Sequence, residues 1–218
     1  MLSSLINIIF HFIHAQNKLQ GYFKEIKDIG LSCRNLNDLN VQRIKGKYSK
    51  PIVYMSVGRS VNLQKEIDLE GLPYQFVYTE GIKLKGKNTE LLPVNTDSTH
   101  DYINAADYVI TKAGWGTVAE AICARKPMLV LRRDEVVEDR VTLKKLVELG
   151  IALPISTKDL NANYLSGLLR QLETMRENYK NLSSRYYNCS DKIAEQVLEY
   201  LHGEAVQSGK NCKFYCRP

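Results

Sequence analysis

Short apolar runs alternate with helix-like segments over residues 51–202, and this alternation is the clearest pattern in the chain. The apolar, β-rich runs lie at 52–57, 74–79, 90–94, 107–111, 127–132 and 151–155. Helical spacing separates the later runs, at 98–106, 117–126 and 139–150, and dominates 157–202. Strands that are apolar almost throughout and alternate with helices predict an α/β fold, a Rossmann-like parallel sheet with helices on both faces.

The first 50 residues do not follow this alternation. Their apolar positions recur at helical spacing, namely at Leu2, Leu5, Ile6, Ile9, Phe10 and Ile13. The stretch is shorter than the roughly 20 residues of a membrane-spanning helix, and it has no basic start or small-residue cleavage site of a secretory signal. It predicts a helix that packs on the core or lies on a membrane surface.

Three parts follow from these patterns. Residues 1–50 form a helical N-terminal lead-in, or the remnant of a missing N-terminal domain, and end in the basic stretch "QRIKGKYSK". Residues 51–203 form the Rossmann-like domain. Residues 204–218 have no apolar periodicity, which predicts a flexible tail.

Composition and charge limit the kinds of partner that the chain is expected to bind. With 44% apolar and 25% charged residues, the chain has ordinary globular composition. Its net charge of +6 comes from scattered lysines and arginines. Such a charge is typical of a solvated surface, and it also suits an anionic membrane or a phosphorylated substrate. No nucleic-acid-binding motif accompanies the charge, so we expect no nucleic-acid partner.

The cysteines indicate a reducing compartment. There are five, an odd number at irregular spacing, and Cys123 lies inside an apolar helical pattern. Free thiols in a cytoplasmic protein explain this usage best. Cys212 and Cys216 lie near each other, but no second cysteine or histidine pair has matching spacing, and the chain has no Asp-x-Asp motif. We therefore expect no bound metal.

Two glycine loops follow predicted strands, and they carry the candidate chemistry. The first is Gly58-Arg59-Ser60, and the second is Gly114-Trp115-Gly116-Thr117. In open parallel sheets, ligands bind at the carboxyl ends of the strands. Glycines let the backbone approach closely, and N–H groups at a helix start suit a diphosphate.

Glu120 has two interpretations that the sequence leaves open. Thr117 and Glu120 have the spacing of a capping box, in which Glu120 accepts a hydrogen bond from a backbone N–H at the helix start. Alternatively, a glutamate one turn into a helix behind a phosphate loop accepts hydrogen bonds from ribose hydroxyls.

The stretch "ADYVITKAGWGTVAEAICARKPMLVL" and the earlier "VYMSVGRS" make a family resemblance specific. Together they resemble the C-terminal, nucleotide-sugar-binding half of GT-B glycosyltransferases. The most similar type is family 28, which includes the N-acetylglucosaminyltransferase acting on the peptidoglycan precursor. The resemblance covers residues 51–200. It implies one half of a GT-B fold, a nucleoside-diphosphate sugar as donor, UDP-linked, and no further cofactor.

The resemblance also implies roles for individual residues. Gly58, Arg59 and Ser60 lie beside the diphosphate or the donor sugar. A second phosphate loop is formed by Gly114, Trp115, Gly116 and Thr117.

Further roles implied by the resemblance concern the rest of the donor. Glu120 holds the ribose hydroxyls, and the stretch around Asn95 contacts the base through backbone atoms. The family has a Gln- or Asn-bearing motif that contacts the donor sugar where this chain has Glu138, Asp139 and Arg140. The identity of the donor sugar therefore stays open.

The sequence does not provide an acceptor-binding domain or a catalytic base. About 50 residues are too few to build the N-terminal domain of a GT-B enzyme. The leading interpretation is a glycosyltransferase, or its donor-binding half, that glycosylates an acceptor hydroxyl together with a separate acceptor-binding domain or subunit. It would be cytoplasmic and peripheral at the inner membrane face. Two alternatives are a nucleotide-sugar hydrolase or epimerase using Glu138 and Asp139, and a non-catalytic sugar-nucleotide-binding subunit.

Overall fold

The computed structural model describes residues 8–11, 25–28, 30–58, 61, 63 and 65–208. The chain divides into two compact units. One comprises Cys33–Tyr186, and the other combines Met1–Ser32 with Tyr187–Pro218. Arg59 and Ser60, which the sequence placed in the first glycine loop, lie outside the described residues.

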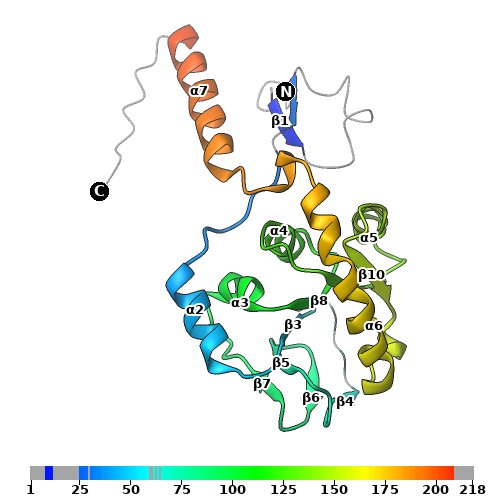
Figure 1. The fold of residues 1–218 in the computed structure, drawn as a ribbon. Helices are drawn as coiled ribbons and strands as arrows, with labels where there is room; N and C mark the ends of the chain where they lie inside the picture. Colours follow the sequence, from blue (N-terminus) through cyan, green and yellow to red (C-terminus); the bar gives the residue numbers. More distant parts are fainter. Residues whose placement is uncertain are drawn as a thin grey trace. The chain divides into compact units, whose positions relative to one another are not determined.

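A six-stranded, fully parallel sheet forms the centre of the larger unit (Figure 1). Its strand order is β10-β9-β8-β3-β5-β7. The strands are β3 (Ile52–Ser56), β5 (Gln75–Tyr78), β7 (Thr89–Leu91), β8 (Tyr108–Lys112), β9 (Met128–Leu131) and β10 (Ala152–Ile155). From β3 the chain moves outward to β5 and β7, then returns to β8 on the other side of β3 and continues to β9 and β10. The order therefore reverses between β3 and β8.

Helices α2 (Asp38–Lys47), α3 (Thr99–Ala105), α4 (Trp115–Cys123), α5 (Val137–Glu148) and α6 (Ala162–Thr174) accompany this sheet. Three short 3₁₀ turns occupy Thr157–Asp159, Arg176–Asn181 and Ser184–Tyr186. A separate two-stranded parallel pair is formed by β4 (Glu66–Asp68) and β6 (Lys83–Lys85).

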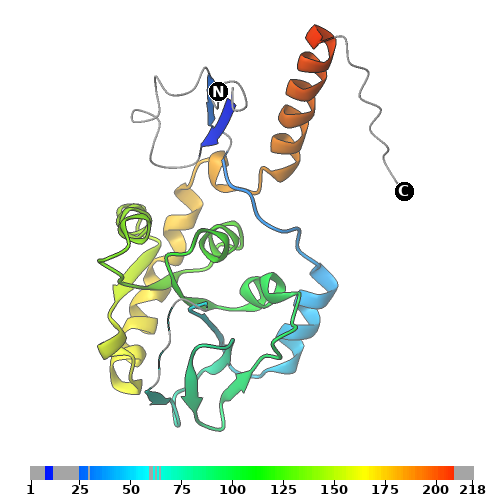
Figure 2. The same cartoon turned by 180° about the vertical axis from the view of Figure 1, so that it is seen from behind.

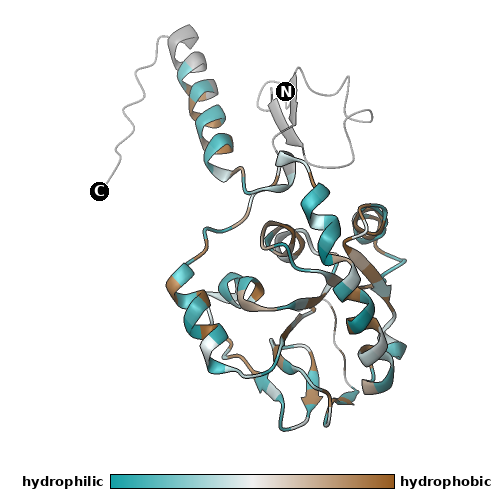
Figure 3. Ribbon diagram, in the orientation of Figure 1, coloured by the Kyte–Doolittle hydropathy of each residue, from teal (hydrophilic) through white to brown (hydrophobic). Residues whose placement is uncertain are grey.

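Both faces of the sheet are covered, because side chains alternate along each strand. On one face, strand residues cluster with Leu165, Leu169 and Leu172 of α6 and with apolar residues from β4 and β6. On the other face, α3 packs on β3 and α4 packs on β8 (Figure 2). Hydrophobic colours gather on the central strands and α4, whereas α6 alternates (Figure 3). The predicted Rossmann-like parallel sheet with helices on both faces is confirmed.

Gly150 ends α5 as the sequence predicts. The helix stops at Glu148, and Gly150 has φ +68°, the left-handed conformation that glycine adopts without steric cost after a helix. Its carbonyl accepts a hydrogen bond from the Asn178 side chain at 2.7 Å. The strands β4 and β6 were not expected, because each is three residues long with one buried apolar position.

The smaller unit contains β1 (Ile8–His11), β2 (Glu25–Asp28) and α7 (Ser190–Ser208), with β1 and β2 pairing in parallel. The helical spacing around residues 2–13 predicted a helix, but Ile8–His11 form a strand, because pairing with a distant strand overrides local periodicity. Helix α7 continues past residue 204, the expected start of the tail. Within the part of the chain that is described, no helix combines the length and apolar character needed to cross a membrane.

Asn88 holds the connection between β4 and β5 and gives a test of the stability of the larger unit. Its buried amide nitrogen donates to the carbonyls of Leu69, Leu72 and Tyr74 at 3.1, 3.2 and 3.0 Å. Removing this side chain leaves buried carbonyls without a donor. We expect Asn88→Ala to lower the free energy of unfolding by about 2–3 kcal/mol, measured by urea denaturation. Exposed Asn163 in α6 is the control, where alanine should change stability by less than about 0.5 kcal/mol; similar losses at both positions would contradict the role of Asn88.

Candidate functional site

Strand pairing brings the two glycine loops together at the point where the strand order reverses. Strands β3 and β8 are neighbours, with Ser56 opposite Thr111 in the register. Gly58 follows β3 and Gly114 follows β8, so both loops begin at the same edge of the sheet. Gly58 has φ +64°, a conformation that favours glycine. This is the position at which open parallel sheets bind ligands.

Lys112 lies against both glycines. A Cβ atom added to Gly58 would be 3.3 Å from Lys112 Cε and 3.6 Å from its Nζ. A Cβ on Gly114 would be 3.0 Å from the same Cε. The two glycines thus leave the room that the lysine side chain fills, and they bring its ammonium to the junction of the loops. Lys112 is not among the residues expected from the sequence, although a basic residue between a strand and a glycine loop is a usable signal.

Helix α4 starts directly behind the second loop. Gly114 is its N-cap residue and, as a glycine, has no side chain to cap the helix. Trp115, Gly116 and Thr117 therefore form its first turn, where backbone N–H groups have no acceptor within the helix. The N-terminal end of the helix also carries partial positive charge. Together with Lys112, this places positive potential at the junction of the loops.

The capping-box interpretation of Thr117 and Glu120 is wrong. It requires Thr117 to be the N-cap residue, but the helix begins at Trp115, before that threonine. Thr117 is therefore the third helical residue, and Glu120 lies nearly a turn further along. Glycine can take the extended N-cap conformation (φ −67°, ψ 126°) that starts this helix early. Glu120 is consequently available for another role.

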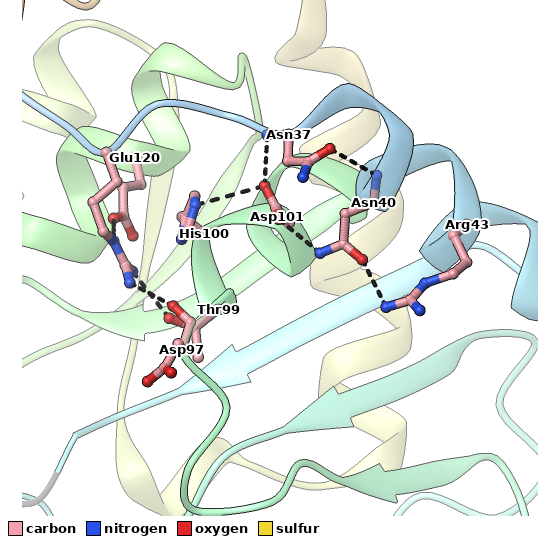
Figure 4. A network of polar contacts seen from close by, with 9 residues as sticks. Asn37, Asn40, Arg43, Asp97, Thr99, His100, Asp101 and Glu120 are labelled. Carbon is pink, nitrogen blue, oxygen red and sulfur yellow. Dashed lines mark hydrogen bonds and ion pairs between the residues drawn. The ribbon is translucent and has the colours of Figure 1, made fainter. Parts of the chain in front are cut away.

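Glu120 is paired with an arginine from the segment before α2. Its side chain is only 8% exposed, and its Oε1 accepts a hydrogen bond from Arg34 Nε at 2.7 Å. Arg34 also donates to the carbonyl of Asp97 and to the hydroxyl of Thr99, each at 3.0 Å (Figure 4). The hydrogen bond from Arg34 to Glu120 raises the pKa of the guanidinium further, so Arg34 stays positively charged at any physiological pH.

A pocket of about 150 Å³ lies beside these groups. It is lined by Gly58, Thr79, Glu80, Leu92, Pro93, Val94, Thr96 and Thr99, from the carboxyl ends of β3, β5 and β7 and the start of α3. Thr99 connects the pocket to Arg34, since it lines the former and accepts a hydrogen bond from the latter. Asn95 is exposed between two lining residues, Val94 and Thr96.

The three residues at the start of α5 have separate environments. Asp139 is buried, and its Oδ2 lies 3.1 Å from Arg133 Nη1, so its carboxylate is held within the protein. Glu138 and Arg140 are exposed. Among the described residues, no hydrogen bond or ion pair connects these three side chains to the glycine loops. Their role toward a donor sugar stays a prediction.

The fold and the edge at which its glycine loops meet define the class: a Rossmann-like domain with an anion-compatible site at its topological switch point. Glycosyltransferase family 28 C-terminal domain is the family that matches, over residues 53–197. The match covers more than half of the chain, and the chain belongs to this family. Among curated proteins, none matches.

Solved glycosyltransferases share the fold. UGT2 of Phytolacca americana, complexed with UDP-2fluoro-glucose and pterostilbene, gives TM-score 0.61 at 14% identity, covering 89% of this chain and 53% of that one. Arabidopsis thaliana UGT89C1, complexed with UDP, gives 0.58 at 13%, covering 85% and 54%. SnogD from Streptomyces nogalater gives 0.53 at 16%, covering 69% and 44%. The chain thus spans about half the length of these enzymes.

Replacement by alanine should change the stability of the protein differently at Gly58 and at Gly116. Gly58 combines a positive φ with close contact to Lys112, so Gly58→Ala should lower the free energy of unfolding by about 1–2 kcal/mol. A Cβ on Gly116 meets nothing within 4 Å, and the residue is helical, so Gly116→Ala should be neutral or stabilising by up to about 1 kcal/mol. Thermal and urea unfolding measure both, and a larger loss at Gly116 would contradict this geometry.

Proposed function

We propose that this chain binds a nucleoside-diphosphate sugar, UDP-linked, and serves as the donor-binding half of a glycosyltransferase. The observation that carries the proposal is the position of Lys112 between two glycine loops, beside the N-terminus of α4. A cation, glycine backbone and a helix N-terminus together suit a diphosphate. Membership of the family and the UDP complexes of two structural neighbours support the same ligand.

The position proposed for the diphosphate also suggests where the base and the ribose of the donor bind. In the proposed arrangement, the base enters the pocket near Leu92 and Val94, and the ribose lies between this pocket and Glu120. The buried carboxylate of Glu120 accepts ribose hydroxyls. The pocket is below the about 300–1,000 Å³ typical of whole ligand sites, which suits one end of a nucleotide sugar.

The proposed reaction is displacement of the nucleoside diphosphate by an acceptor hydroxyl. Negative charge develops on the leaving diphosphate as its bond to the sugar breaks. Lys112 and the first-turn N–H groups of α4 are fixed where they would stabilise that charge. We assign no base for the acceptor proton to this chain.

A separate domain or subunit would supply the acceptor. The chain spans about half of the neighbouring enzymes, and the acceptor side is therefore the part to look for elsewhere. The same coverage of about half of the neighbouring enzymes also suits the second candidate, a non-catalytic donor-binding subunit.

Hydrolase or epimerase chemistry has less support. It needs a carboxylate at the donor sugar, and Asp139 is instead held by Arg133 at 3.1 Å. A cytoplasmic location at the inner membrane face, with attraction to anionic lipid, stays a prediction from the basic charge and the apolar N-terminal stretch.

Lys112 gives the first test of the ligand class. Calorimetric titration of the wild-type protein should show that affinity decreases from UDP to UMP to uridine, because the diphosphate makes most of the contact. Lys112→Met should weaken UDP about tenfold or more, since a charge-assisted hydrogen bond contributes roughly 1.5–3 kcal/mol, and should leave uridine unchanged. Lys144→Met, at an exposed lysine of α5, is the matched control. Equal affinity of the wild type for UDP and uridine would overturn the proposal.

Glu120 gives the second test, aimed at the ribose. The wild type should prefer UDP to its 2′-deoxy analogue. Glu120→Gln should lose most of that preference and bind UDP about tenfold or more weakly, because a neutral amide makes weaker hydrogen bonds than a carboxylate. Glu148→Gln, on the exposed side of α5, should behave as the wild type. If Glu120→Gln discriminates the two ligands as the wild type does, Glu120 does not bind the ribose.

A further inference from the structure

Arg34 engages Glu120 in a way that leaves part of the hydrogen-bonding capacity of the carboxylate unused. The described contact uses Nε of the arginine and only Oε1 of the glutamate, at 2.7 Å. The other two guanidinium nitrogens are directed elsewhere, to the Asp97 carbonyl and the Thr99 hydroxyl. A carboxylate offers about four acceptor positions on its two oxygens. Arg34 can therefore fix the orientation of the carboxylate without using all of its capacity.

The guanidinium is itself held in place from several sides. Its three nitrogens contact α4 through Glu120 and the start of α3 through Thr99 and the preceding Asp97 (Figure 4). A planar group with three directed contacts has one orientation, which a lysine ammonium would not reproduce. The arginine also balances the charge of a carboxylate that is 8% exposed.

The segment that carries Arg34 is bound to the same two helices. Asp101 of α3 accepts hydrogen bonds from the Asn37 backbone at 3.0 Å and from the Asn40 side chain at 2.7 Å. Next to Arg34, Cys33 accepts a hydrogen bond from Cys123 at the end of α4, which lowers the pKa of the Cys33 thiol. The backbone on both sides of Arg34 is thereby attached to α3 and α4.

We propose that Arg34 is a positioning residue of the donor site: it holds the Glu120 carboxylate in the orientation that accepts the ribose hydroxyls, and so sets the preference for ribose over deoxyribose. This inference rests on the proposed function, in which Glu120 binds ribose. Arg34 does not have to leave when the donor binds, because Asp97 and Thr99 retain it. Its effect on the ligand is exerted through Glu120.

A double-mutant cycle tests this coupling. The variants are Arg34→Gln, Glu120→Gln and the two together, and the measured quantity is the affinity ratio of UDP to 2′-deoxy-UDP. We expect Arg34→Gln to reduce the wild-type ratio by about three- to tenfold, less than complete loss of a hydrogen bond to a charged group would, because the carboxylate remains but is no longer aligned. In the Glu120→Gln background the same change should have no further effect on the ratio.

Two further variants separate positioning from general effects. Arg34→Lys keeps the positive charge but lacks the planar fork, so it should restore UDP affinity in part while the ratio stays low. Arg170→Gln, at an exposed arginine of α6 whose side chain contacts Ser166 of the same helix, should leave both unchanged. Thermal melting of each variant without ligand checks that the fold is retained, and it separates any loss of stability due to the unbalanced Glu120 carboxylate from a loss of ligand binding.

Three outcomes overturn the inference while the proposed function stands. The first is an unchanged affinity ratio in Arg34→Gln. The second is tighter UDP binding in Arg34→Gln, which would make Arg34 a competitor of the ribose. The third is a further loss of the ratio when Arg34→Gln is added to Glu120→Gln. Failure of the proposed function is visible earlier, in the wild type, as equal affinity for UDP and uridine.

Discussion

The parallel pairing of β3 with β8 is the constraint on which the site depends. These strands are far apart in sequence, yet Ser56 and Thr111 are register partners. Because both strands run in the same direction, the loops that follow them leave the sheet at one edge. The reversal of strand order at this pair sends the chain away from the pair in opposite directions after β3 and after β8, which opens space above the edge. Every group assigned to the donor diphosphate belongs to the end of β8, where Lys112 lies, to the two loops or to the helix behind them.

Electrostatics divides the site into two ends. Lys112 and the N-terminus of α4 place positive potential at the glycine loops, whereas Glu120 lies within α4, further from that end. A diphosphate and a ribose have opposite requirements, a cation for the former and an acceptor for the latter. In the proposed arrangement, the two ends therefore fix the direction in which a nucleoside diphosphate would bind. Without Arg34, the same carboxylate would be a nearly buried charge without a balancing cation, which is costly.

The sequence predicts the fold better than the detail of the site, for physical reasons. Apolar runs such as "IVYMSV" need burial on both faces, and only a covered parallel sheet supplies it. The ends of helices are less determined. The spacing of Thr117 and Glu120 fits a capping box, but the helix already starts after Gly114. Sequence spacing alone does not show this earlier start. Lys112 could have been found from its place between strand and loop.

Arg34 could not have been found, because its partner lies 86 positions away along the chain. Local periodicity and motif spacing carry no information on such a contact. The family motif accounts for Glu120 but says nothing of what orients it. A motif of this kind specifies the groups that touch the ligand, while the orientation of those groups is set by packing from elsewhere in the chain. In the proposed arrangement, the segment before α2, outside the matched region at 53–197, supplies that orientation. The proposed donor site therefore includes Arg34, and a domain cut at the start of the family match would keep Glu120 but lose the arginine that is bonded to it.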